Sequence, residues 1–149
     1  MADRKLFEYN LQDAWQMPIS SVTILQDQNI VFYTLPRDGA EKFPPQDHKS
    51  VEISNEAMEK VKSIITESRV FEIDEVEENM DIFCLDGVIN EFYVSNENKD
   101  NTVEAFNLST YKSYTKKYPK AAKLIKLLKD LSKVLVPEGV DKRCFYLGY

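Results

Sequence analysis

Glycine is scarce in this chain, and its few positions lie far apart. Among 149 residues there are four glycines, at Gly39, Gly87, Gly139 and Gly148. A phosphate-binding loop or a dinucleotide-binding turn needs several glycines within a few positions, because the backbone must approach the phosphates closely. The common kinds of nucleotide-dependent enzyme are therefore disfavoured.

Cysteine and histidine are scarce too. Cys84 and Cys144 lie far apart in apolar runs, which predicts buried free thiols and favours a reducing, cytoplasmic setting. His48 is the single histidine, and no cysteine or carboxylate stands near it at the spacing of a metal site. The acids of residues 72–81 lack the ligand pattern and glycine of a calcium loop, although a loosely bound divalent ion is an alternative there. We predict neither a metal nor a cofactor.

Long hydrophobic runs are missing. The first ten residues, MADRKLFEYN, contain no apolar stretch of the kind that forms a secretory signal. No segment approaches the roughly 20 apolar residues that a membrane-spanning helix needs. We therefore expect a soluble, cytoplasmic protein with no membrane span.

Charge is plentiful and unevenly distributed. The net charge is −6, yet residues 112–133 hold eight lysines and one acid. The rest of the chain holds 11 basic and 24 acidic residues, and six of those acids fall within Glu72–Asp81. Such a chain has a strong electric dipole unless the fold places the two regions side by side.

Two stretches of the N-terminal half carry clear strand and helix patterns. The β-prone residues 22–25 and 30–35 flank a polar turn, which is typical of a β-hairpin. Ser54 precedes an amphipathic pattern over residues 55–68, and serine is a favoured N-cap of helices. The sequence also indicates a helix at 3–14, a loop at 36–49 and a short strand at 50–54.

The C-terminal half predicts an antiparallel meander followed by a long helix. Residues 70–108 alternate β-prone runs with polar turns, and Asp86-Gly87 between two such runs is a strong hairpin signal. Pro119 suits the first turn of a helix that runs to about residue 136. A short helix at 109–117 and a final strand at 143–149 complete the pattern.

These elements together define the expected fold. Helices that alternate with antiparallel hairpins fit a sheet with helices on one face. We predict a single α+β domain over residues 1–149, with an antiparallel sheet, a hairpin plus a meander, covered on one face by two main helices. A chain of this length can bury a hydrophobic core without disulfides or a metal.

The helix predicted over residues 119–136 has an apolar face and a basic face. Its leucines share one side, Lys126 and Lys133 point the other way, and Lys123 flanks the apolar stripe. The simplest interpretation of these lysines is a solvated helix surface. Among ligands, nucleic acid is opposed by the acidic remainder of the chain, and membrane binding would need the leucines to be free. An acidic protein partner is therefore favoured.

The acids cluster in one short segment whose members include Glu72, Asp74, Glu75, Glu77 and Glu78. Glu72 and Asp74 alternate with Phe71 and Ile73, so we expect them to project from a strand. One interpretation is a solvated edge that prevents strand-to-strand aggregation. The other is a contact surface that attracts a basic protein partner.

The sequence thus predicts a small protein-binding or regulatory module that acts through charge-complementary surfaces, with no catalytic residue. In composition it is similar to small bacterial proteins that neutralise or regulate a partner. The predicted partner-binding residues are Glu72, Asp74, Glu75, Glu77, Glu78, Lys123, Lys126 and Lys133. Nucleic acid is disfavoured as a partner.

The alternative is a small hydrolase or ligand-binding domain with a carboxylate-lined cleft between the sheet edge and residues 36–49. Asp81, Asp86 and Glu91 fall near one predicted hairpin, and two carboxyls with different pKa values in one cleft can perform acid–base chemistry. A turn role for Asp86 and outward positions for the other two explain the same residues more simply.

Overall fold

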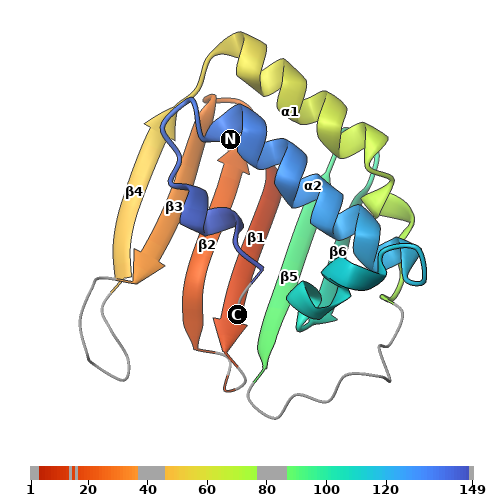
Figure 1. Ribbon diagram of the computed structural model, residues 1–149. Helices are drawn as coiled ribbons and strands as arrows, with labels where there is room; N and C mark the ends of the chain where they lie inside the picture. The colour runs from red at the N-terminus through yellow and green to blue at the C-terminus, as the bar shows by residue number, and fades with distance from the viewer. Residues whose placement is uncertain (1–3, 14, 16, 37–45, 77–86, 148–149) are drawn as a thin grey trace.

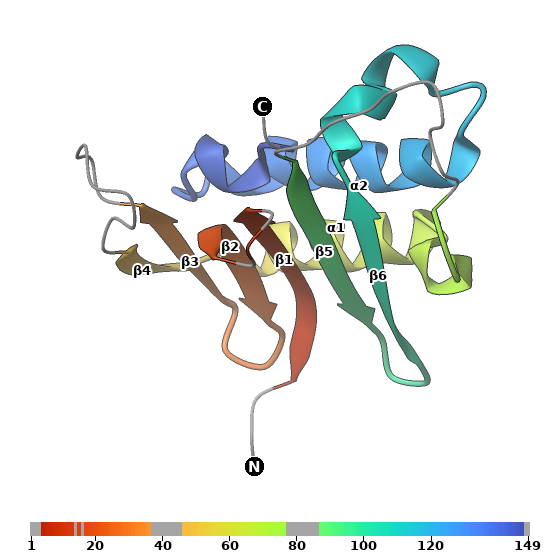
Figure 2. The same ribbon diagram turned by 90° about the horizontal axis from the view of Figure 1, so that it is seen from below.

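A six-stranded antiparallel sheet forms one layer of the protein, and two helices form the other. The structure is a computed structural model that describes residues 4–13, 15, 17–36, 46–76 and 87–147. The strands are β1 (Lys5–Asp13), β2 (Pro18–Leu25), β3 (Ile30–Pro36), β4 (Gln46–Glu52), β5 (Val88–Ser95) and β6 (Asp100–Phe106), in the spatial order β4-β3-β2-β1-β5-β6. The helices α1 (Asn55–Glu67) and α2 (Pro119–Leu135) run side by side in opposite directions over one face (Figures 1 and 2). The predicted α+β fold class is confirmed.

β1 lies inside the sheet between β2 and β5, so the helix predicted over residues 3–14 is wrong. Phe7 and Tyr9 are fully buried under the helices, whereas Glu8 between them lies on the opposite face. This alternation has the period of a strand. Leu6 is buried as well, and two consecutive apolar residues hide the alternation in the sequence. The pairing with β5, where Tyr9 lies opposite Phe92, then decides the conformation.

The predicted hairpin is confirmed as β2 and β3, which pair with Val22 opposite Tyr33 and Ile24 opposite Val31. β4 begins at Gln46, earlier than the predicted strand at 50–54, so the loop predicted at 36–49 is wrong for its last residues. Backbone hydrogen bonds to β3 form whatever the side chains are, and they draw this polar stretch into the sheet.

The helix predicted after Ser54 is confirmed as α1. Ser54 Oγ accepts a hydrogen bond from the backbone N–H of Ala57 at 3.1 Å, which is the expected N-cap bond. Glu138, from the far end of the chain, accepts bonds from the Ser54 N–H at 2.8 Å and the Ser54 hydroxyl at 2.7 Å. These bonds hold the pKa of the Glu138 carboxyl below its ordinary value.

The strand predicted at the start of the meander is wrong. Arg69, with a φ of 59°, redirects the chain after α1, and a 3-10 helix, η1 (Val70–Glu72), follows. Asn101 Nδ2 donates to the carbonyls of Val70 and Ile73, at 2.8 Å each, and ties this segment to the beginning of β6. The conformation is therefore fixed by a contact from a distant strand.

The second half of the predicted meander is confirmed by β5 and β6, which pair with Phe92 opposite Val103. The preceding run at 80–85 and Asp86 of the predicted turn lie outside the described residues. Gly87 is described, and a Cβ at this position would overlap the side-chain amide of Asn107. That amide accepts a hydrogen bond from the N–H of Val88 at 2.8 Å, so the space is needed for a bond that starts β5.

The long helix predicted over residues 119–136 is confirmed as α2, with Pro119 in its first turn. Its apolar side faces the sheet and α1, and its buried residues are Ala121, Leu124, Leu127, Leu128, Leu131 and Leu135. A 3-10 helix, η2 (Leu108–Tyr114), stands where the short helix at 109–117 was predicted. Among the described residues, no helix is long and apolar enough to cross a membrane.

The final strand predicted at 143–149 is wrong. A 3-10 helix, η3 (Lys142–Phe145), follows α2, and residues 142–147, which we call the C-terminal segment, pack against β2, β3 and α2. Cys144 is fully buried in this segment, as its apolar surroundings predicted. Burial raises the pKa of its thiol to about 12. Cys84 lies outside the described residues.

Candidate functional site

The predicted lysines of α2 lie on the outer side of the helix layer. Lys126 and Lys133 are exposed, and Lys123 is half-buried beside the apolar stripe. Lys126 Nζ forms an ion pair with Asp130 Oδ2 at 2.6 Å, and this bond raises the pKa of Lys126. The charge of Lys126 is therefore largely satisfied within α2 itself.

Five other lysines of this region differ from Lys126 in this respect. Within the described part of the chain, none of the following five forms an ion pair: Lys112, Lys116, Lys123, Lys129 and Lys133. We call these five residues the lysine surface. The leucines of α2 are buried in the core, and none of these five lysines belongs to the core.

The acids predicted as a contact surface follow α1. Glu72, Asp74 and Glu75 are all exposed, and we call these three the acidic segment. They project from η1 and the chain after it, and the strand predicted to carry them is absent. Glu77 and Glu78 lie outside the described residues. The chain after α1 and the beginning of α2 lie at the same end of the molecule (Figures 1 and 2).

A groove opens between α2 and the C-terminal segment. It has a volume of about 430 Å³. Leu128, Phe145 and Leu147 form an apolar floor and are almost fully buried. The remaining lining residues are Ile125, Ser132, Tyr146, Lys112 and Lys129. We call this cavity the α2 groove, and it joins an apolar floor to two cations of the lysine surface.

One wall of the α2 groove is held by a buried polar cluster that the sequence analysis missed. Tyr9 Oη donates to the carbonyl of Tyr146 at 2.7 Å, and Asn90 Nδ2 donates to Tyr9 Oη at 2.8 Å and to the carbonyl of Leu147 at 3.0 Å. Asn90 Oδ1 accepts from the N–H of Leu108 at 3.0 Å. Burial raises the pKa of Tyr9 and keeps its hydroxyl protonated as a donor.

A signal for this cluster was present in the sequence. Asn90 lies on the same face of β5 as Phe92 and Val94, which are buried in the core. An amide at such an inward position needs hydrogen-bond partners, because an unsatisfied buried polar group is costly. The pattern can identify Asn90 as a structural residue, although it cannot name the distant carbonyl that it binds.

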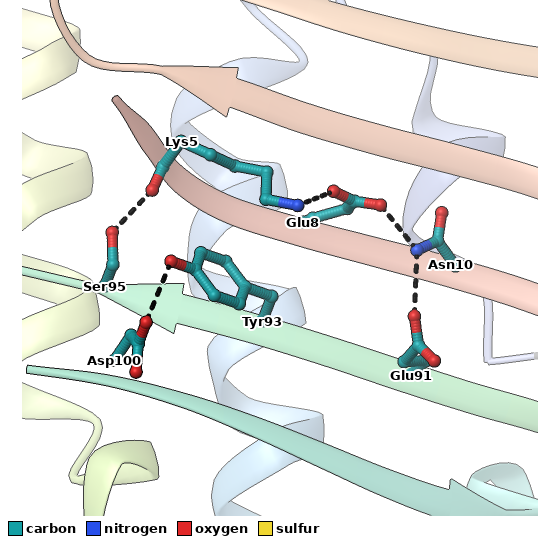
Figure 3. A network of polar contacts seen from close by, with 7 residues as sticks. All are labelled: Lys5, Glu8, Asn10, Glu91, Tyr93, Ser95 and Asp100. Atoms are coloured by element: carbon teal, nitrogen blue, oxygen red, sulfur yellow. Dashed lines mark hydrogen bonds and ion pairs between the residues drawn. The ribbon is translucent and has the colours of Figure 1, made fainter. Parts of the chain in front are cut away.

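The face of the sheet turned away from the helices carries a second polar network (Figure 3). Lys5 Nζ contacts Glu8 Oε2 at 2.6 Å, and Asn10 Nδ2 donates to Glu8 at 2.7 Å and to Glu91 at 3.2 Å. Partial burial acts to raise the pKa of Glu8, but the bonds from Lys5 and Asn10 together outweigh it and lower this pKa below its ordinary value. Glu8 is therefore an ionised carboxylate.

A catalytic acid would need a carboxyl with a raised pKa. Among the described carboxyls whose pKa departs from the ordinary value, Glu8, Glu138 and Asp141 all shift downward. Asp81, Asp86 and residues 37–45, which belong to the predicted carboxylate cleft, lie outside the described residues. The hydrolase or ligand-binding alternative thus stays a prediction from the sequence.

Comparison with known proteins gives no identification. No protein-family model matches this chain, and no curated protein matches it. The lysine surface, the acidic segment and the α2 groove are the surface features of this protein that can bind a partner.

Proposed function

We propose that the protein is a small protein-binding module that recognises an acidic partner through the lysine surface. The observation that carries this proposal is the combination of five lysines without ion-pair partners in the described part of the chain and a helix whose leucines are buried in the core. Exposed charges of one sign attract a partner of opposite charge at long range and raise the rate of association.

The same features argue against other ligands. α2 and the turn before it contain lysines and no arginine, and lysine lacks the planar fork that binds phosphate in two-point contacts. An amphipathic helix that binds a membrane inserts its apolar side, but the leucines of α2 are buried against the sheet. An acidic protein surface requires only the exposed lysines.

The acidic segment is proposed as a second contact surface, for a basic partner. Its three carboxylates are exposed, and none of them forms an ion pair with a described residue. The module would then bind through two surfaces of opposite sign.

Capture of partners from cells of the native host, followed by mass spectrometry, tests the proposal. The wild-type protein is compared with Lys129→Glu/Lys133→Glu, which reverses two charges of the lysine surface. The control is Lys49→Glu/Lys60→Glu, which changes the net charge equally at exposed positions of β4 and α1. We expect an acidic protein that wild type and control retain and that the lysine-surface variant loses. Equal capture by all three proteins would show that the lysine surface binds no partner.

A further inference from the structure

We propose that the α2 groove binds an acidic peptide segment that carries one bulky apolar side chain. This inference rests on the proposed function, because it names the place on the lysine surface where the contact with an acidic partner is closest. The apolar side chain would lie on the floor of the groove, and the carboxylates that flank it in the peptide would contact Lys112 and Lys129.

The floor of the groove fits an apolar side chain. Leu128, Phe145 and Leu147 supply aliphatic and aromatic surface, and Ile125 and Tyr146 extend it toward solvent. The volume of about 430 Å³ lies in the range of about 300–1,000 Å³ that is usual for ligand sites. Tyr146 is half-exposed, so a ligand would bury aromatic surface that is now in contact with water.

The charges of the groove fit carboxylates. Lys112 comes from η2 and Lys129 from α2, so cations approach the groove from two different elements. No acidic residue is found among the described residues that line it. An acidic peptide would place carboxylates near both lysines without meeting a like charge in the lining. A neutral peptide would leave the two lysines without partners.

The groove is preformed, which lowers the entropic cost of binding. The carbonyls of Tyr146 and Leu147 accept hydrogen bonds from Tyr9 and Asn90, whose side chains are fully buried. The opposite wall is the rigid helix α2. A site whose walls are already fixed loses little conformational freedom when it binds.

Peptide binding measured by fluorescence anisotropy tests this inference. The probe is a labelled peptide with a central phenylalanine flanked on both sides by aspartate and glutamate, and the matched probe has alanine in place of the phenylalanine. We expect the phenylalanine peptide to bind wild type with a Kd at least about tenfold lower than the alanine peptide. Equal binding of the two probes would contradict binding of the apolar side chain in the α2 groove, because charge alone would then explain the affinity.

Two variants of α2 locate the contact. Lys129→Glu changes a lysine that lines the groove, and Lys133→Glu makes the same change one turn further along the helix, outside the lining. Lys129→Glu should raise the Kd of the phenylalanine peptide at least about tenfold, and Lys133→Glu at most about threefold. Equal effects would assign the peptide to the helix surface as a whole. Both lysines are exposed, and thermal unfolding checks that each variant is folded.

Nuclear magnetic resonance gives an independent location. On titration with the phenylalanine peptide, the backbone amides of Ile125, Ser132 and Tyr146 should show the largest chemical-shift changes.

Tighter binding of anionic lipid vesicles or of an oligonucleotide than of the peptide would contradict the choice of a peptide ligand. A partner that is lost from Lys129→Glu/Lys133→Glu but does not compete with the phenylalanine peptide would contradict the groove and leave the proposed function standing. If neither the capture of an acidic partner nor the binding of the peptide is observed, the proposed function is contradicted as well.

Discussion

Ser20 and Ser95 are both buried serines of the sheet, at 3% and 5% exposure, but their hydroxyls differ in bonding. Ser95 Oγ donates to the backbone carbonyl of Lys5. Ser20 Oγ has no hydrogen-bond partner in the described part of the chain. A buried polar group without a partner costs about 1–3 kcal/mol of stability. The same residue type therefore has opposite effects at two positions of one sheet.

Ser20→Ala should raise the free energy of unfolding, by up to about 1 kcal/mol, because it removes a hydroxyl that lost its water and gained no partner. Ser95→Ala is the matched control and should lower this free energy by about 1 kcal/mol or more, since it leaves a carbonyl with one bond fewer. Denaturation in urea measures both variants. A loss of stability in Ser20→Ala as large as in Ser95→Ala would show that the Ser20 hydroxyl has a partner.

Local sequence patterns predicted some of the secondary-structure elements correctly and others wrongly. The Ser54 cap, the β2–β3 turn and Pro119 act on their own neighbours, so α1, the hairpin and α2 were predicted from the sequence. β1 is a strand because it pairs with the adjacent β2 on one side and with the distant β5 on the other. The C-terminal segment is not a strand, because Tyr9 and Asn90 fix its carbonyls. Neither contact leaves a local pattern.

Some features of the candidate site could likewise be predicted from the sequence, and others could not. The outward position of Lys126 and Lys133 follows from helical periodicity, and the structure places both there. The α2 groove joins α2 to residues that follow it after a turn and to Lys112 before it, so it exists only in the folded chain. The position of η1 depends on Asn101, which lies about thirty residues away in the sequence. Sequence periodicity can predict a face of one element, but it cannot predict a cavity between several.

The anchoring of the C-terminal segment can be tested through Cys144, which is the one cysteine left in a Cys84→Ser background. Asn90→Ala should speed the reaction of Cys144 with a thiol reagent at least about tenfold, because it leaves the Leu108 N–H and the Leu147 carbonyl without a partner. In the closed segment the pKa of the thiol is raised to about 12, so little thiolate forms near pH 8. Opening lowers that pKa toward its ordinary value of 9.0 and permits reaction.

The control for this experiment is Val61→Ala, which removes core volume in α1 and destabilises the whole fold. If the C-terminal segment opens by itself, Val61→Ala should leave the labelling rate of Cys144 almost unchanged. Equal acceleration by both variants would mean that Cys144 reacts only after global unfolding.

In the molecule as a whole, the acidic segment and the lysines of α2 are closer together than their separation in the sequence suggested. The acidic segment follows α1, and the lysine-rich beginning of α2 lies at the same end (Figures 1 and 2). Further acids, Glu8, Glu91 and Glu104, lie on the face of the sheet away from the helices. The positive field of the lysine surface is therefore opposed by negative charge from two directions, and an approaching partner experiences their sum.

Reversal of the acidic segment should consequently change association rates in opposite directions for partners of opposite sign. In Glu72→Lys/Asp74→Lys/Glu75→Lys, the acidic phenylalanine peptide should associate at least about threefold faster at low salt, because a repulsive field near its path is removed. A basic protein captured through the acidic segment should associate at least about tenfold more slowly. Stopped-flow fluorescence measures both rates. Both differences should shrink as the ionic strength rises toward about 0.15 M, where the screening length is about 8 Å.

The control for this reversal must carry the same change in net charge at other positions. Glu52→Lys/Glu56→Lys/Glu97→Lys meets that requirement, because all three glutamates are exposed and none belongs to the acidic segment. If the acidic segment acts through its position, the control should change the association rates much less than the reversal does. Equal effects of the two triple variants would show that net charge alone sets the rates. The acidic segment would then be a surface that keeps the protein from aggregating and not a contact for a partner.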